Sequence, residues 1–226
     1  MTWGSGTSGV LGVVGPGNSL VGKGNFNFLG RSGVVELKNG NYVVVSERWD
    51  KGGVADAGAV TWANGTTGIS GLVSDTNSFV GSTTQDKVGT VLAGSDNSAK
   101  AAITILNNGN YVISSPYWNN DGTADAGAVT WANGTTGISG TITIANSLVG
   151  TQLAERLGGG GSDSVLPLTG SSNYLVSNPV WKNGTATNAG AVTWGSGTSG
   201  VVGTISAANS LIGSTANDLV GQSLNI

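Results

Sequence analysis

The sequence predicts an all-β protein built from tandem four-stranded antiparallel units, and three observations lead to this prediction. Glycine accounts for 40 of the 226 residues and only 9% of residues are charged, whereas an ordinary soluble domain has about 7% glycine and about 25% charged residues. Short runs rich in Val, Ile, Thr and Tyr alternate with Asn-Gly and Gly-Ser-Gly segments, a pattern typical of strands and turns. The phrase AGAVTWANGTTGISG occurs twice without change, at 57–71 and 126–140, which indicates an internal repeat.

Four tryptophans mark the copies of this repeat, and the spacing around them is fixed. An Asn-Ser pair begins fifteen residues after each of these anchor tryptophans, which are Trp3, Trp62, Trp131 and Trp194. A glycine follows twelve residues after the Asn of each pair, and only the distance from this glycine to the next Tyr varies. This distance is 12, 22 and 16 residues, from Gly30, Gly89 and Gly158 respectively. We therefore expect a single repeat domain over 1–226, with its length variation confined to one solvent-facing connection. Its units run approximately over 1–22 (partial), 23–82, 83–150, 151–214 and 215–226 (partial).

Each full unit is expected to contain four strands. The first strand is placed at 34–37, 103–106 and 223–226, the second at 41–46, 110–115 and 173–178, the third in each GAVTW segment, and the fourth at 69–74, 138–144 and 201–206. Asn-Gly pairs predict tight turns at 39–40 and 108–109. Those at 64–65 and 133–134 predict tight turns with positive φ at both central residues. Four strands in a period of roughly 59 residues are typical of a β-propeller blade. A stacked β-solenoid is the alternative.

The repeat unit resembles the FG-GAP repeat of integrin-α-type β-propellers. Val88-Gly89 and Val220-Gly221 stand where that repeat has its FG pair, and GAVTW at 58–62 matches its third strand closely. The unit is also similar to a repeat of unassigned function in very large bacterial surface or adhesin-like proteins. The resemblance covers essentially the whole chain and implies a propeller. Many FG-GAP blades carry a calcium loop rich in Asp, but the matching segments at 38–41, 107–110 and 170–173 have no carboxylate, so calcium is not carried over to that site.

Composition excludes several classes of function. The chain has no His and no Cys, which removes His-based catalytic triads, thiol nucleophiles, zinc–thiolate sites and disulfides. Nine Lys and Arg against twelve Asp and Glu leave no basic stripe for nucleic acid. No apolar run is long enough for a membrane helix, and the N-terminus shows no signal peptide. The low charge favours an extracellular or cell-surface location, most simply in a bacterium.

The acidic residues do not predict an enzyme. Asp56 and Asp125 occupy equivalent positions in two units, where Asn188 stands in the third, and a residue repeated by symmetry rarely serves as a unique acid or base. The loop that holds Asn119, Asp121 and Asp125 could offer oxygen ligands to a hard cation. Its third copy has no carboxylate, which favours a hydrated turn instead. We expect no catalytic residue, no metal site and no cofactor.

Tryptophan supplies the only candidate ligand-binding residues. Trp49, Trp118 and Trp181 begin a polar loop in each full unit, and aromatic faces of this kind can stack on sugar rings. The competing interpretation, which we favour, is that these loop tryptophans cover the edge of a blade. The anchor tryptophans each end an apolar strand and are expected in the core between blades.

The sequence therefore favours a non-enzymatic extracellular repeat module that acts as a structural scaffold or adhesive element. A carbohydrate-binding propeller with glycan partners is one alternative, and an engineered propeller fragment or designed assembly is another. The chain opens at the end of a third strand and closes inside a first strand. Because an open strand edge recruits another chain, we expect self-association into a homo-oligomer or fibre, without nucleic acid or membrane insertion.

Overall fold

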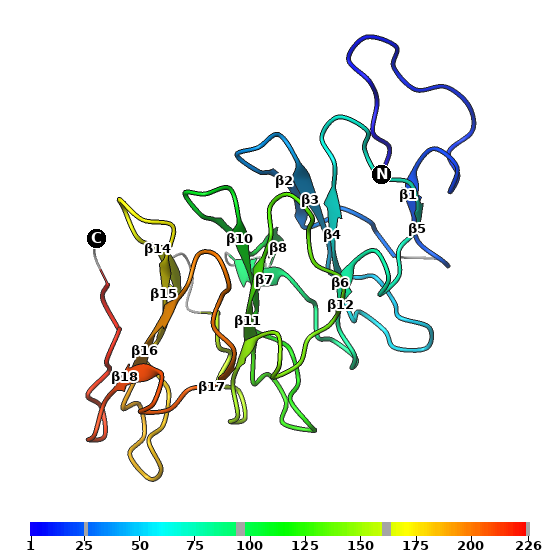
Figure 1. Cartoon of the computed structure of the whole chain (residues 1–226). Coiled ribbons are helices and arrows are strands. Elements are labelled where there is room, and N and C mark those ends of the chain that lie inside the picture. Colours follow the sequence, from blue (N-terminus) through cyan, green and yellow to red (C-terminus); the bar gives the residue numbers. More distant parts are fainter. Residues whose placement is uncertain (25–26, 94–97, 160–163, 225–226) are drawn as a thin grey trace.

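The computed structural model describes residues 1–24, 27–93, 98–159 and 164–224, and within these ranges all regular secondary structure is β-strand. Three sheets of four or five strands follow one another in a row, with the N-terminal strands at one end and the C-terminal segment at the other (Figure 1). The prediction of an all-β fold made of tandem antiparallel sheets is confirmed. No helix in the described part of the chain is long and apolar enough to cross a membrane.

Each full unit builds the core of one sheet from four antiparallel strands. In the first unit these are β2 (Gly33–Glu36), β3 (Tyr42–Ser46), β4 (Ala59–Ala63) and β6 (Phe79–Val80). The second unit has β9 (Ile103–Ile105), β10 (Tyr111–Ser115), β11 (Ala128–Ala132) and β13 (Leu148–Val149). The third has β14 (Val165–Pro167), β15 (Tyr174–Asn178), β16 (Ala191–Gly195) and β18 (Ser210–Ile212). The second and third predicted strands are confirmed in all three units.

The predicted fourth strand does not join the sheet of its own unit. These segments form β5 (Gly71–Leu72), β12 (Gly140–Thr141) and β17 (Gly203–Thr204). Each pairs in parallel with the strand that follows the Asn-Ser pair of the preceding unit, which is β1 (Leu20–Val21), β6 or β13. The sequence pattern identified an extended segment but not its partner, because hydrophobic periodicity does not say which sheet edge a strand will meet. The fourth strand of each unit is instead the short segment after its own Asn-Ser pair.

The two predicted turns differ in outcome. At the first, the Gly40 amide donates to the Leu37 carbonyl at 3.0 Å and Gly40 has a φ of 81°, so the tight turn is confirmed. At the second, the chain makes a longer loop in which the Gly68 amide donates to the Asn64 carbonyl at 2.8 Å. The positive φ falls on Gly68, at 70°, and not on Asn64 or Gly65. The predicted two-residue turn is therefore wrong at this place.

The apolar cores lie between consecutive units. One core cluster joins Val43, Val45 and Phe79 of the first unit to Tyr111 and Ile113 of the second. A second cluster joins the second and third units in the same way, and a third joins the N-terminal segment to the first unit. In the first and second units both faces of the central strands are therefore covered, which is why the residues of β10 are buried without alternation. Stability of this kind is shared between neighbours, as in other repeat proteins.

The variable connection is longest before the second unit, where it contains an additional hairpin. This hairpin consists of β7 (Thr90–Ala93) and β8 (Ser98–Ala101), and its Ala101 amide donates to the Ser32 carbonyl of the preceding connection at 2.9 Å. At the other end of the chain, Ser223 and Leu224 do not form the predicted first strand of a further unit. Asn225 and Ile226, the rest of that predicted strand, lie outside the described residues.

Candidate functional site

The tryptophans singled out as ligand candidates are buried. Trp49, Trp118 and Trp181 are 4%, 5% and 8% exposed, and each belongs to a core between two units. The anchor tryptophans are less buried: Trp62 and Trp131 are half-buried, and Trp194 is 52% exposed. The predicted order of burial is therefore wrong. In the first two units both faces of the third strand are covered by neighbouring sheets, and the anchor tryptophan lies at the rim. Trp194 belongs to the third unit, where the described residues form a core on one face only.

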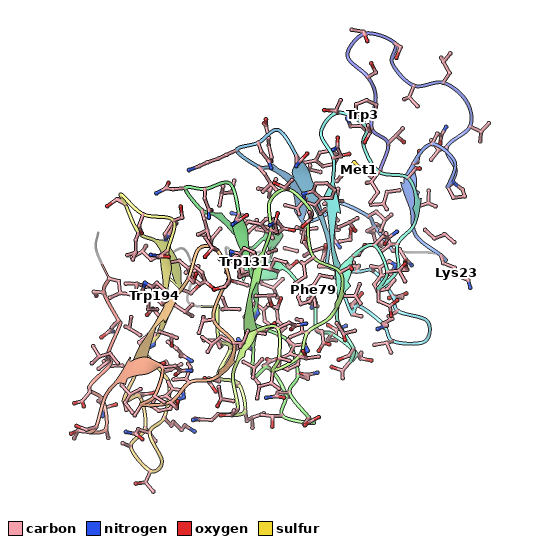
Figure 2. All side chains as sticks on the ribbon, viewed as in Figure 1. Met1, Trp3, Lys23, Phe79, Trp131 and Trp194 are labelled. Atoms are coloured by element: carbon pink, nitrogen blue, oxygen red, sulfur yellow. The ribbon has the colours of Figure 1, made fainter. Side chains whose placement is uncertain are left out.

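The rim position of the anchor tryptophans brings each indole to the next unit. The Nε1 atoms of Trp3, Trp62 and Trp131 donate to the carbonyl oxygens of Gly65, Gly134 and Gly197 at 3.1, 3.0 and 3.0 Å. These three acceptors, here called the loop glycines, occupy the same position in consecutive units. Trp3, Trp131 and Trp194 accordingly lie one after another along the row (Figure 2).

Asparagine side chains reinforce the same contact from two sides. Asn41 Oδ1 accepts from the Gly65 amide of its own unit at 3.1 Å, while Asn41 Nδ2 donates to the Gly134 carbonyl of the next unit at 3.0 Å. Asn110 repeats both bonds, to Gly134 and Gly197, at 3.0 and 2.8 Å. One amide therefore connects two loop glycines, and the pattern continues from unit to unit. We call this arrangement of anchor tryptophan, bridging asparagine and loop glycine the junction.

The junction requires glycine because backbones approach closely there. A Cβ atom on Gly134 would lie 1.9 Å from the Gly109 carbonyl oxygen, and one on Gly65 would lie 1.8 Å from the Gly40 carbonyl oxygen. Gly137, at the end of the same loop, would place a Cβ 2.5 Å from Trp62 Cβ. The Asn-Gly pairs that suggested a two-residue turn are thus explained by close packing at Gly65 and Gly134.

Buried carboxylates form a second contact between units. Asp86, which follows the last strand of the first sheet, accepts from the Ser82 and Thr83 amides at 2.8 Å and from the Asn119 amide, between β10 and β11 of the second sheet, at 3.1 Å. In the next copy, Glu155, which follows β13 of the second sheet, accepts from Nδ2 of Asn178, at the end of β15 in the third sheet, at 2.9 Å. Burial raises the pKa of both carboxyl groups, and their hydrogen bonds lower it in part. Their partners are amides that position a loop, as expected of structural carboxylates.

The other acidic candidates are also engaged in local contacts. Glu47 accepts a hydrogen bond from Ser32 Oγ, and its carboxylate lies 3.7 Å from an Arg31 side-chain nitrogen. It therefore does not share a partner with Glu155, whose carboxylate bonds to Asn178. Asp125 forms an ion pair with Arg156 at 2.9 Å, and Asp56 accepts from Gln85 Nε2 at 2.7 Å. Among the described residues, no three acidic side chains gather where they could hold a metal ion.

Grooves accompany the junctions. Trp62 and Trp131 line equivalent hollows of about 280 and 220 Å³, which the next unit closes with Gly137 and Gly200 respectively. A separate cavity of about 410 Å³ lies beside Trp49 and is lined by Lys23, Lys51 and Asp75. The first two hollows occupy the same place in successive units.

Comparison with known families agrees with this repeating geometry. The model of a repeat of unknown function, DUF5650, matches residues 1–31, 36–90, 105–159 and 168–222. The chain belongs to the DUF5650 repeat family. Its three complete DUF5650 matches have the same length, and the gaps between matches fall in the connection that the spacing marked as variable. No curated protein matches the chain.

Each complete DUF5650 copy contains the residues of the junction. The anchor tryptophan, the bridging asparagine and the loop glycine all fall inside the matched segments. The sequence pattern instead places the anchor tryptophans in the core between blades, Asn41 and Asn110 at the start of the second strand, and Gly65 and Gly134 in tight turns. The available signal was that every copy holding an anchor tryptophan also holds a glycine three residues later.

Proposed function

We propose that this chain is a non-enzymatic structural module, a scaffold or adhesive element of an extracellular or cell-surface protein. The observation that carries the proposal is the donation of a strand by each unit to the sheet of the unit before it. β12 extends the first sheet to five strands, and β17 extends the second. A unit that completes its neighbour in this way suits a load-bearing array, because its stability comes from nearest-neighbour contacts.

The distribution of polar groups supports the same function. Three kinds of contact join consecutive units, namely the strand pair, the junction and the buried carboxylate. The indole N–H groups of Trp3, Trp62 and Trp131 and the buried carboxylates of Asp86 and Glu155 are engaged in these contacts. The proposal includes self-association through open strand edges, and a bacterial surface location and a propeller relationship of the FG-GAP kind remain predictions.

Hydrogen exchange on the full chain tests the structural role. If the units form one mechanical element, amides in β3, β10 and β15 should open together, with comparable protection. Protection factors that differ by orders of magnitude between the first and second units would show that the units unfold independently, and would contradict the proposal.

A carbohydrate-binding function is the second candidate, and the recurrence of the grooves favours it. The hollows beside Trp62 and Trp131 place a half-buried indole at the same position in successive units, and an aromatic face can stack on a sugar. Binding by Trp49, Trp118 or Trp181 stays a prediction, and their burial means that a loop would have to move first. A glycan array followed by tryptophan-fluorescence titration tests this function. A saturable change in tryptophan fluorescence that Trp131→Ala removes supports this function, and the absence of binding to any glycan on the array contradicts it.

A further inference from the structure

The last unit exposes an apolar side chain that every other unit buries. Leu20, Phe79 and Leu148 follow the Asn-Ser pair in successive units and are 0% exposed, because the next unit lays a strand beside them. Leu211 occupies the same position on β18 and is 71% exposed. Correspondingly, the third sheet has four strands and β18 lies at its edge.

The N-terminal segment exposes the complementary surface. Val73, Ile142 and Ile205 follow the donated strand in the three full units and are only 4%, 4% and 8% exposed. Val14 occupies the equivalent position and is 65% exposed, and Val13 beside it is 93% exposed. In the full units, the corresponding segment packs on the preceding unit. The N-terminal segment has no such unit among the described residues.

Polar groups at the two ends match as well. Trp194 is 52% exposed, whereas the other anchor tryptophans donate Nε1 to the loop glycine of the following unit. Gly6 has the loop-glycine position in the N-terminal segment, and a Cβ atom there would meet nothing within 4 Å. The donor and its acceptor position are therefore both accessible, at opposite ends of the row.

The N-terminal segment is already held in the shape that strand donation needs. Asn18 Nδ2 donates to the Val13 carbonyl at 3.2 Å, as Asn77 Nδ2 donates to the Leu72 carbonyl at 2.9 Å. Gly12 has a φ of 101°, the same value as Gly140 in the donated strand β12. Little ordering is needed before pairing, which lowers the entropic cost of association.

We propose that the N-terminal segment of a second copy of this chain docks head to tail on the third unit. Gly12 and Val13 of that copy would pair in parallel with β18, covering Leu211, and Trp194 Nε1 would donate to the Gly6 carbonyl. This inference rests on the proposed structural function and names its partner. It continues the interface seen between consecutive units. Because the two faces differ, the contact is heterologous and forms a ring or an open filament.

Sedimentation velocity over a range of concentrations tests the docking. Leu211→Lys and Val14→Lys each place a charge on one face, at positions too exposed to disturb the fold of a single chain. Leu153→Lys is the matched control, since Leu153 is 73% exposed and lies between the ends of the row. We expect the unaltered chain and the Leu153→Lys variant to associate as concentration rises, and each face variant alone to stay monomeric.

An equimolar mixture of the two face variants gives the sharpest result. Each variant keeps one intact face, so the mixture should form a species of two chains and nothing larger. A strictly monomeric unaltered chain, face variants that associate as it does, or a mixture that stays monomeric would each overturn the docking. None of these outcomes bears on the hydrogen-exchange test, which measures contacts within one chain, so the structural role of the units within a chain and the association between chains can fail separately.

Discussion

Trp62 Nε1 donates a 3.0 Å hydrogen bond to the carbonyl oxygen of Gly134, 72 residues further along the chain. The same oxygen also accepts from Asn39 Nδ2 at 2.9 Å and from Asn41 Nδ2 at 3.0 Å. A single carbonyl of the second unit therefore satisfies three donors of the first. A buried or half-buried donor without a partner destabilises the folded chain. The first unit therefore depends on the second for hydrogen-bond acceptors as well as for a strand.

The loop tryptophans should contribute more to stability than the anchor tryptophans, contrary to the expectation from sequence. Trp118→Ala removes a side chain that is 5% exposed and lies in the core between the first and second units, and should cost about 3–5 kcal/mol in the free energy of unfolding. Trp131→Ala, at a half-buried site, should cost clearly less. Denaturant titration of both variants measures the difference, and an equal or reversed order would contradict the burial described above.

The bridging asparagines provide a matched pair for measuring the junction. Asn110 bonds to Gly134 in its own unit and to Gly197 in the next, whereas Asn173 makes the first bond, to Gly197, without a following unit among the described residues. Asn110→Ala should therefore destabilise the chain more than Asn173→Ala, by about 1 kcal/mol for the additional bond. Equal midpoints in dilute denaturant titrations would show that the bond between units contributes nothing.

The ionisation of two buried carboxyl groups should lower the free energy of unfolding as the pH rises from acidic values. Burial raises the pKa of Asp86 and Glu155 above their ordinary values of 3.8 and 4.5, so the folded chain binds protons more tightly than the unfolded chain. Their favourable contribution is complete below the ordinary pKa and is lost as pH rises through the raised folded value. Melting temperatures across this range should therefore decline less with pH in the double variant Asp86→Asn, Glu155→Gln.

Asn27 occupies the position of Asp86 in the N-terminal unit and is buried, so an asparagine fits this site. An unchanged pH profile in the double variant would show that other groups set the dependence.

Calcium should have no saturable effect on the melting temperature. The segments at the position of the FG-GAP calcium loop lack carboxylates, and Asp125 is paired with Arg156 while Asp56 is bonded to Gln85. Thermal scans with and without millimolar calcium measure this. A rise of several degrees that Asp121→Asn or Asp125→Asn abolishes would contradict it.

Local sequence predicted the local elements of the fold, and failed where a distant partner decides the outcome. The second and third strands follow from β-branched runs such as 42–46, and the first turn follows from Asn39 and Gly40. The destination of Gly140 and Thr141 depends on a strand edge at Phe79, about 60 residues earlier. The burial of Trp118 likewise depends on a neighbouring sheet. Periodicity within a segment contains no information on either contact.

The dependence of one unit on the strand of the next can be measured most directly with Gly140→Pro and Gly12→Pro. Both glycines have a φ of 101°, which a proline ring cannot adopt, so each substitution forces the backbone out of the same local conformation. Only Gly140 donates its amide to the preceding unit, to the Ser78 carbonyl at 3.1 Å. In dilute solution, Gly140→Pro should lower the free energy of unfolding by about 1–3 kcal/mol more than Gly12→Pro, since it leaves a buried acceptor without its donor. Equal losses in the two variants would contradict the account that each unit completes the sheet before it.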